Sequence, residues 1–423
     1  MDWYYYIIAA VLILSQLIFM WHPCRNYHYA LTKYKKQRLL YRPKTALIVP
    51  CKGLDSAFQQ NITSLFNQDY ENYLLWFVVA DKEDPAFTAL CELKNRLSQS
   101  SKAKDVQILV AGPAQSCSQK NHNLLYGCQR VGSDVEVLAF ADSDICVRSD
   151  WLSHIVYPLR KSKNGAATGY RWYVPKKNNL ASLTLSAVNA KIAQLLGNTP
   201  FNQAWGGSMA IRVNVFRELG IDKIWLKTLS DDLSLSYAVK KARKKIVFVP
   251  ACLVASYESI TWGELFEFGR RQFLITRIST PGTWWFGLAS SLYSILGSWG
   301  GIVFAIYASS QFSTLNFQLL IFIAVPILFF TAQFIRAVLR QKMAYKLLNY
   351  ERQETPALSK VEGSDERRTM KSAMVADLLF FWLWSLLMLF FIISSAFGRT
   401  LTWRGIKYKL LGPTQTIVLN KNQ

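Results

Sequence analysis

Four long apolar segments constrain the fold of this chain more than any other feature of its sequence. They cover residues 3–21, 285–309, 315–335 and 378–397, and none of them contains a charged side chain. An α-helix rises 1.5 Å per residue, so about 20 apolar residues cross the hydrocarbon core of a bilayer. The first segment has neither a basic leader nor a small-residue cleavage site, which favours an uncleaved anchor at residues 1–22 over a signal peptide. We therefore predict an integral, multi-pass membrane protein.

The formal net charge of +22 agrees with that prediction. Basic residues follow the first segment and fill the stretch between the last two, so the positive-inside rule places the residues after the anchor in the cytoplasm. The tail, residues 398–423, conflicts with this rule, because four crossings would put its basic residues on the far side. Either the tail is an exception or one segment is re-entrant. A nucleic-acid partner could also explain the charge, but we do not expect one, because the basic residues share the chain with long uncharged spans.

Residues 40–260, between the anchor and the second apolar segment, alternate between predicted strands and helices. Short apolar runs predict strands at 45–50, 74–80, 106–110 and 135–141, and helical patterns cover 56–67, 85–97 and 119–131. This alternation is typical of an α/β domain with a parallel sheet. The seven cysteines form no Cys-x-x-Cys pair, so we expect neither a disulfide framework nor a zinc site.

Acidic residues occur in pairs where predicted strands end or helices begin. The pairs are Asp81 with Asp84, Asp142 with Asp144, and Asp231 with Asp232. Ligands of open α/β sheets bind beyond the carboxyl ends of the strands, and Mg²⁺ is usually held by one or two carboxylates and substrate phosphates. Asp-x-Asp is also a common turn sequence, and one acid alone would cap a helix. Together the three pairs suit sugar transfer from a nucleotide diphosphate, which needs acids for the nucleoside, for a metal and for a proton.

Two further helices are expected beside this domain. Residues 180–196 carry an apolar stripe and would pack on the sheet or rest at the bilayer surface. Residues 261–280 open with a capping box, Thr261 to Glu264, and combine aromatic residues with three arginines directly before the membrane block. We interpret them as an interfacial helix, although a solvated basic face is the alternative. The Gly206-Gly207 pair indicates either a close backbone approach to a ligand or a tight turn.

With these residues in view, the chain resembles family 2 glycosyltransferases, and most closely their ceramide glucosyltransferase branch. The resemblance runs over nearly the whole chain. It is carried by Val49 to Asp55, Ala80 to Ala86, Gln119-Lys120-Asn121, Asp142-Ser143-Asp144, Ser230-Asp231-Asp232, and Trp403-Arg404-Gly405 with Tyr408. It implies a GT-A (Rossmann-like) nucleotide-sugar domain at 40–260, an interfacial helix at 261–280, transmembrane helices within 285–397 and a tail at 398–423.

The resemblance also implies roles for the second and third acidic pairs. Asp142 would contact the nucleoside and Asp144 would bind Mg²⁺ or Mn²⁺. Asp232, next to Asp231, would be the general base that accepts the proton of the acceptor hydroxyl.

Donor-binding roles follow in the same way for five other residues. Asp81 would contact uracil or ribose, with Asp84 in the same motif, and Lys120 would contact the nucleotide. Arg270 or Arg271 would contact the diphosphate. The chain departs from the family's Gln/Arg-x-x-Arg-Trp motif, because Leu274-Ile275 stands where Arg-Trp is expected. That tryptophan often lies beside the acceptor, so the identity of the acceptor stays open.

The sequence thus predicts an inverting glycosyltransferase that moves a hexose, glucose or a relative, from a UDP-sugar to a membrane lipid. Ceramide-like lipids and diacylglycerol both offer the required hydroxyl. The alternatives are a processive polysaccharide synthase of the same family and a non-catalytic membrane protein that binds lipid or nucleotide. The oligomeric state is left open.

Overall fold

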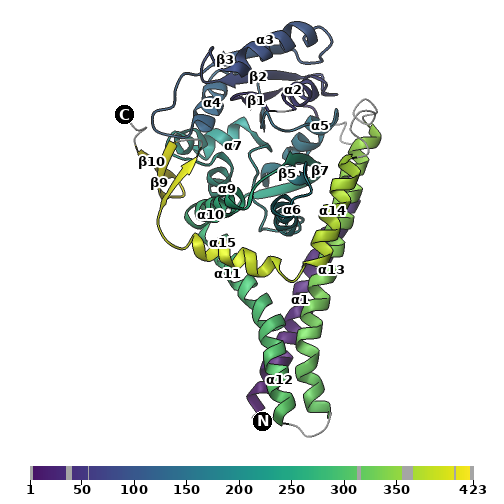
Figure 1. The fold of residues 1–423 in the computed structure, drawn as a ribbon. Coiled ribbons are helices and arrows are strands. Elements are labelled where there is room, and N and C mark those ends of the chain that lie inside the picture. Colours follow the sequence, from purple (N-terminus) through teal and green to yellow (C-terminus); the bar gives the residue numbers. More distant parts are fainter. Residues whose placement is uncertain are drawn as a thin grey trace.

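The computed structural model describes residues 3–34, 41–55, 57–311, 316–354, 365–403 and 406–419. An α/β domain forms the head of the molecule, and long helices form a stalk below it (Figure 1). The predicted α/β class with added transmembrane-length helices is therefore confirmed. Arg404 and Gly405, part of the C-terminal motif noted above, lie outside the described residues.

The head is built on a seven-stranded sheet of order β3-β2-β1-β4-β6-β5-β7. Its first four strands are parallel and match the predicted ones: β1 (Thr45–Pro50), β2 (Tyr73–Val79), β3 (Asp105–Val110) and β4 (Val137–Ala141). The sequence did not reveal the other three, β5 (Asn164–Pro175), β6 (Ser208–Arg212) and β7 (Lys245–Glu258). Strand β6 runs antiparallel between β4 and β5, and β7 pairs parallel with β5.

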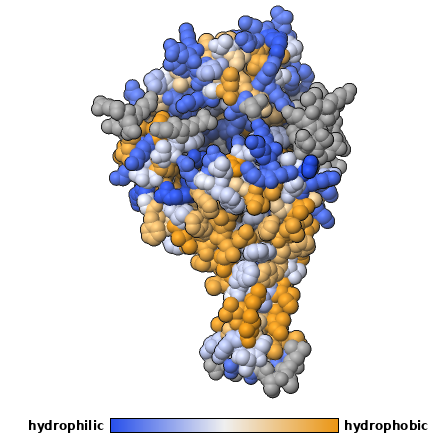
Figure 2. All heavy atoms as spheres, in the orientation of Figure 1, coloured by the Kyte–Doolittle hydropathy of each residue, from blue (hydrophilic) through white to orange (hydrophobic). Residues whose placement is uncertain are grey.

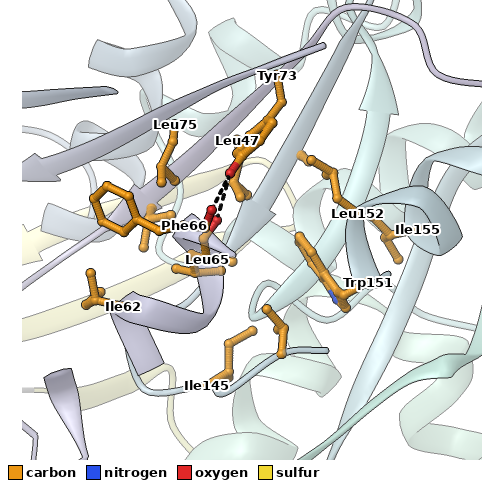
Figure 3. Packing of buried hydrophobic residues seen from close by; sticks show 14 of the residues in the cluster. Leu47, Ile62, Leu65, Phe66, Tyr73, Leu75, Ile145, Trp151, Leu152 and Ile155 are labelled. Carbon is orange, nitrogen blue, oxygen red and sulfur yellow. Dashed lines mark hydrogen bonds between the residues drawn. The ribbon is translucent and has the colours of Figure 1, made fainter. Parts of the chain in front are cut away.

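Helices cover both faces of the sheet because successive residues of β1 and β2 point to opposite faces. Leu47 and Leu75 face a core formed with α2 (Phe58–Phe66), α3 (Pro85–Leu97) and α5 (Trp151–Val156). Figure 3 shows part of this core, where the Tyr73 hydroxyl donates to the carbonyls of Leu65 and Phe66. The opposite face packs on α4 (Gln119–Cys128), α7 (Val213–Glu218), α8 (Ile221–Trp225) and α9 (Asp231–Lys241). Burial on both faces explains why these strands are continuous apolar runs.

Three stalk helices are long and apolar enough to cross a membrane: residues 3–33, 281–311 and 319–348. They comprise α1 (Trp3–Lys33), α11 (Pro281–Ile295) continued through a π-turn by α12 (Gly301–Gln311), and most of α13 (Phe317–Glu354). Hydrophobic side chains cover the stalk and spread over the base of the head (Figure 2). The Ser15 and Tyr293 hydroxyls, 2.7 Å apart, join α1 to α11, and the buried ion pair of Arg340 with Asp377 joins α13 to the next helix in the chain.

The fourth apolar segment is not one straight helix. It is divided between α14 (Asp365–Leu379) and α15 (Trp384–Ser394), whose axes differ by 89°. Helix α15 lies across the base of the head (Figure 1). The chain then returns to the head as a three-stranded antiparallel sheet, β8 (Thr400–Trp403), β9 (Ile406–Gly412) and β10 (Gln415–Leu419). We call this element the C-terminal sheet.

Candidate active site

A cavity of about 750 Å³ lies where the carboxyl ends of the sheet strands meet two helices and the C-terminal sheet. The helices are α6 (Leu180–Ala193) and α10 (Trp262–Ser279). The loops after β1 and β4, the start of α9 and the middle of β5 contribute polar side chains. Helix α6 contributes mostly apolar side chains, including Leu185 and Val188, and α10 contributes apolar ones such as Phe273 together with charged ones such as Glu267 and Arg271. One cavity therefore combines charged groups with an apolar wall.

Five charged side chains in this cavity form a row of alternating sign. Lys120 Nζ lies 3.1 Å from Asp231 Oδ2 and 2.8 Å from Asp142 Oδ1. Arg171 continues the row, with guanidinium nitrogens 3.4 Å from Asp142 and 3.8 Å from Asp144. Three carboxylates and two cations give the row a formal charge of −1. A charged ligand that enters the cavity can form ion pairs with members of the row in place of their present partners.

Arg171 is the member of this row that sequence reasoning missed. It lies within β5, which reads Asn-Gly-Ala-Ala-Thr-Gly-Tyr-Arg-Trp-Tyr-Val-Pro and contains no other charged residue. A single charge inside a long buried strand was the available signal, because such a residue is almost always paired.

The loop before α9 places the third acidic pair at the cavity. Ser230 caps α9 by accepting from Leu233 N at 3.1 Å. Asp232 Oδ1 shares this cap, because it accepts from Leu233 N at 2.7 Å and from the Ser230 hydroxyl at 2.5 Å. Asp231 is 4 % exposed and faces Lys120. Asp232 is half-buried and lines the cavity, and its Oδ2 accepts from Gly206 N at 3.1 Å. A Cβ on Gly206 would lie 2.1 Å from Asp231 Oδ2, so glycine here serves a close approach.

Burial and neighbouring charges shift the pKa values in the row, often in opposite directions. Burial raises the pKa of Asp231 to about 6, although Lys120 opposes the shift. Burial also raises the pKa of Asp144, with Arg171 opposing and Asp142 adding to the effect. For Lys120, burial lowers the pKa, but the carboxylates of Asp142 and Asp231 outweigh it and hold the pKa above its usual value. The lysine is therefore charged at neutral pH, and Asp231 changes charge near pH 6.

The donor set can hold a divalent cation only with help from a ligand. The buried Oδ1 of Asp144 has no hydrogen-bond partner among the described residues. Within the same residues, no group of three or more His, Cys, Asp or Glu side chains could hold a metal ion. One free carboxylate oxygen suits Mg²⁺ or Mn²⁺ whose other ligands are diphosphate oxygens and water.

Three of the predicted donor-binding residues lie outside this cavity. Asp84 caps α3 by accepting from Ala86 N at 2.9 Å and also accepts from Gly53 N at 2.8 Å. Asp81 is exposed after β2. Arg270 Nε donates to the Ser394 carbonyl at 3.2 Å and so ties α10 to α15, whereas Arg271 lines the cavity. The donor-binding roles of Asp81, Asp84 and Arg270 stay predictions.

The C-terminal sheet forms one wall of the cavity through Trp403, Ile406 and Tyr408. Tyr408 is 3 % exposed and packs with Leu229, directly before Ser230, and with Leu274 of α10. Thr416 N also donates to the Lys227 carbonyl at 2.6 Å. Leu274 and Ile275 stand where the family has Arg-Trp, and both contribute to this region. Leu274 packs with Tyr408 and Leu229, and Ile275 lines the cavity.

The parallel-rich sheet with paired carboxylates beyond its strand ends is that of a glycosyltransferase domain of the GT-A type, and the attached helices are long and apolar enough to cross a membrane. The chain belongs to glycosyl transferase family 21, whose sequence model matches residues 3–415.

Two solved structures are similar at low identity. The mannosyltransferase PcManGT from Pyrobaculum calidifontis, in complex with GDP-Man and Mn²⁺, is 13% identical with a TM-score of 0.42, over 92% of this chain and 97% of that one. GalNAc-T7 with UDP, GalNAc and Mn²⁺ is 12% identical with a TM-score of 0.37, over 56% of this chain and 51% of that one. Neither likeness is close enough to transfer a ligand to this chain.

Proposed function

We propose that the protein is an inverting glycosyltransferase that moves a hexose, glucose or a close relative, from a UDP-sugar to the hydroxyl of a membrane lipid. The observation that supports this most is the cavity itself. It joins the charged row to the apolar residues of α6 and α10, and α10 leads directly into the membrane helix that starts at Pro281.

The charged row is suited to the donor. Asp142 would accept hydrogen bonds from the nucleoside, while Lys120 and Arg271 would pair with the diphosphate. Asp144, with its unpartnered buried oxygen, would hold Mg²⁺ or Mn²⁺. When bound, the cation would supply positive charge to the departing diphosphate. Asp81 and Asp84 could take part only if the loop that holds them moves toward the cavity, and Arg270 only if its side chain leaves the Ser394 carbonyl.

Asp232 is the best placed general base. It lines the cavity, and the Gly206 amide fixes one of its oxygens. The lipid hydroxyl oxygen forms a bond to the anomeric carbon of the sugar as Asp232 accepts its proton. The bond from that carbon to the diphosphate oxygen breaks, and its electron pair leaves with UDP. A single displacement of this kind inverts the anomeric centre.

The acceptor would be a neutral lipid, ceramide-like or diacylglycerol, reaching the cavity from the bilayer along α6 and α10. Large apolar residues are exposed on the outer side of the same region, including Leu180, Trp262 and Phe266. They lie on elements that border the apolar base of the head, where a leaflet would cover them.

The C-terminal sheet bears on the topology. Trp403 and Tyr408 line the cavity, which supports a tail on the same side of the membrane as the α/β domain. We propose three crossings, with the bent α14–α15 pair entering the membrane surface without crossing. All basic stretches then lie in the cytoplasm with the catalytic domain, which removes the conflict that four crossings created.

The base and metal assignments are tested by Asp232→Asn and Asp144→Ala in detergent-purified protein. We expect Asp232→Asn to lose turnover while it still binds UDP-sugar, and Asp144→Ala to lose turnover and metal response together. Asp134→Asn, an exposed acid paired with Lys44 away from the cavity, is the matched control. Full turnover by Asp232→Asn would exclude it as the base, and turnover that EDTA leaves unchanged would exclude the metal.

A further inference from the structure

Arg171 is held firmly between the two acids of the Asp142-Ser143-Asp144 motif. Its guanidinium lies 4.6 Å from the Trp205 ring centroid, and Nη1 donates to the Tyr173 hydroxyl at 3.3 Å. The side chain is 15 % exposed. An arginine fixed by stacking, by a hydroxyl acceptor and by two carboxylates keeps a defined position.

That position places a permanent positive charge beside the oxygens to which a divalent cation would bind. Like charges a few ångströms apart in a poorly solvated cavity repel strongly. Arg171 also neutralises part of the carboxylate charge that would attract the metal. A diphosphate changes this balance, because it adds negative charge that both Arg171 and the cation can share.

We propose that Arg171 is a resident counter-ion that makes divalent-cation binding depend on the nucleotide diphosphate. The protein alone binds the metal weakly, because Arg171 competes for Asp142 and Asp144. The diphosphate supplies metal ligands and a second partner for Arg171, so metal and donor bind with positive coupling. Arg171 is a positioning residue in this scheme. The inference rests on the proposed metal-dependent function and extends it to the order of binding.

A purely structural role for Arg171 predicts something different. Its removal would then lower the unfolding midpoint without changing how metal affinity depends on nucleotide. Metal affinity with and without nucleotide therefore separates the two roles.

The experiment measures Mn²⁺ binding to the full-length detergent-purified protein by the electron paramagnetic resonance signal of free Mn²⁺, with and without UDP, after correction for the Mn²⁺ that the same UDP binds in protein-free solution. For the wild type we expect UDP to tighten Mn²⁺ binding on the order of tenfold or more, within the range usual for coupled ligands. For Arg171→Gln we expect tighter Mn²⁺ binding without UDP and a smaller effect of UDP. Arg160→Gln removes the same charge from an exposed arginine that stacks on Tyr157, and should behave as the wild type.

Each outcome has a defined meaning. Equal Mn²⁺ affinity of the wild type with and without UDP overturns the inference, whether or not the Arg171 variants fold. Unchanged affinity in a folded Arg171→Gln overturns it as well, and Arg171→Lys, which keeps the charge, should retain the coupling. If the wild type binds no Mn²⁺ even with UDP, and Asp144→Asn is indistinguishable from it, the metal part of the proposed function fails instead.

Discussion

Replacing Gly206 by alanine tests the charged row without altering any of its members. The added Cβ would lie 2.1 Å from Asp231 Oδ2 and 2.7 Å from Lys120 Nζ. Real Cβ atoms stay at least 3.0 Å from such atoms, so the Asp231 carboxylate must retreat by about 0.9 Å. Asp231 is buried, and Lys120 is fixed by two carboxylates, so neither can move without weakening the ion pair.

The size of the effect follows from the overlap. Inserting one carbon into a closely packed site costs about 1–3 kcal/mol. Since about 1.4 kcal/mol corresponds to a tenfold change in rate, we expect kcat/KM for the UDP-sugar to fall roughly 5- to 150-fold. The Gly206 amide also positions Asp232, so kcat should fall together with kcat/KM.

The assay is UDP release at several donor concentrations, with the unfolding midpoint followed by tryptophan fluorescence. Gly263→Ala is the matched control, because a Cβ there, in the first turn of α10, meets no atom within 4 Å. It should keep wild-type turnover. If Gly206→Ala matches the wild type in both turnover and unfolding midpoint, the close approach of Gly206, Asp231 and Lys120 is not a feature of the working site.

Three further predictions concern the protonation of Asp231, the packing of α10 on α15 and the C-terminal sheet. For the wild type, kcat/KM for the donor should fall as pH drops through about 6, because protonation of Asp231 removes the charge that pairs with Lys120. Asp231→Asn should lack this acid limb, and a pH-rate profile that keeps it would contradict the assignment. Gly269→Ala places a Cβ 2.7 Å from the Phe391 ring, so the unfolding midpoint should drop by an amount equivalent to about 1–3 kcal/mol; an unchanged midpoint would contradict the packing of α10 on α15. Truncation after Gly398 should leave the protein in the membrane fraction but abolish UDP release, and wild-type release would show that the C-terminal sheet is dispensable.

The sequence predicted those parts of the fold that depend on local pattern. Strands β1, β2 and β4 are short apolar runs buried on both faces, and β3 is a partly buried edge strand. Each of the four is followed by a turn and a helix, so length and spacing were enough to find them. Asp142 and Asp231 could be placed at the ends of such elements for the same reason. Lys120 was named from the resemblance, and its two carboxylate partners come from segments far away in the chain.

Features that depend on distant contacts could not be predicted. Strands β5 and β6 carry mixed residues, β7 is a long apolar run that contains Pro250, and the pairing of all three is set by neighbours across the sheet. Arg171 can be recognised as a site residue only from the fold, because β5 brings it next to Asp142 and Asp144. The apolar segment 378–397 has the composition of a span, but composition does not show the 89° bend between α14 and α15. The C-terminal sheet likewise depends on packing against Leu229 and Leu274.

The most direct test of the central claim is the mass of the lipid product. Detergent-purified protein would be incubated with each of several UDP-sugars, Mg²⁺ or Mn²⁺, and ceramide or diacylglycerol, with Asp232→Asn as the inactive reference. We predict that one hexose is added to one lipid by the wild type and none by the variant. Long polymer without glycolipid would indicate a polysaccharide synthase, and neither UDP release nor a glycosylated lipid under any condition would contradict the proposed function.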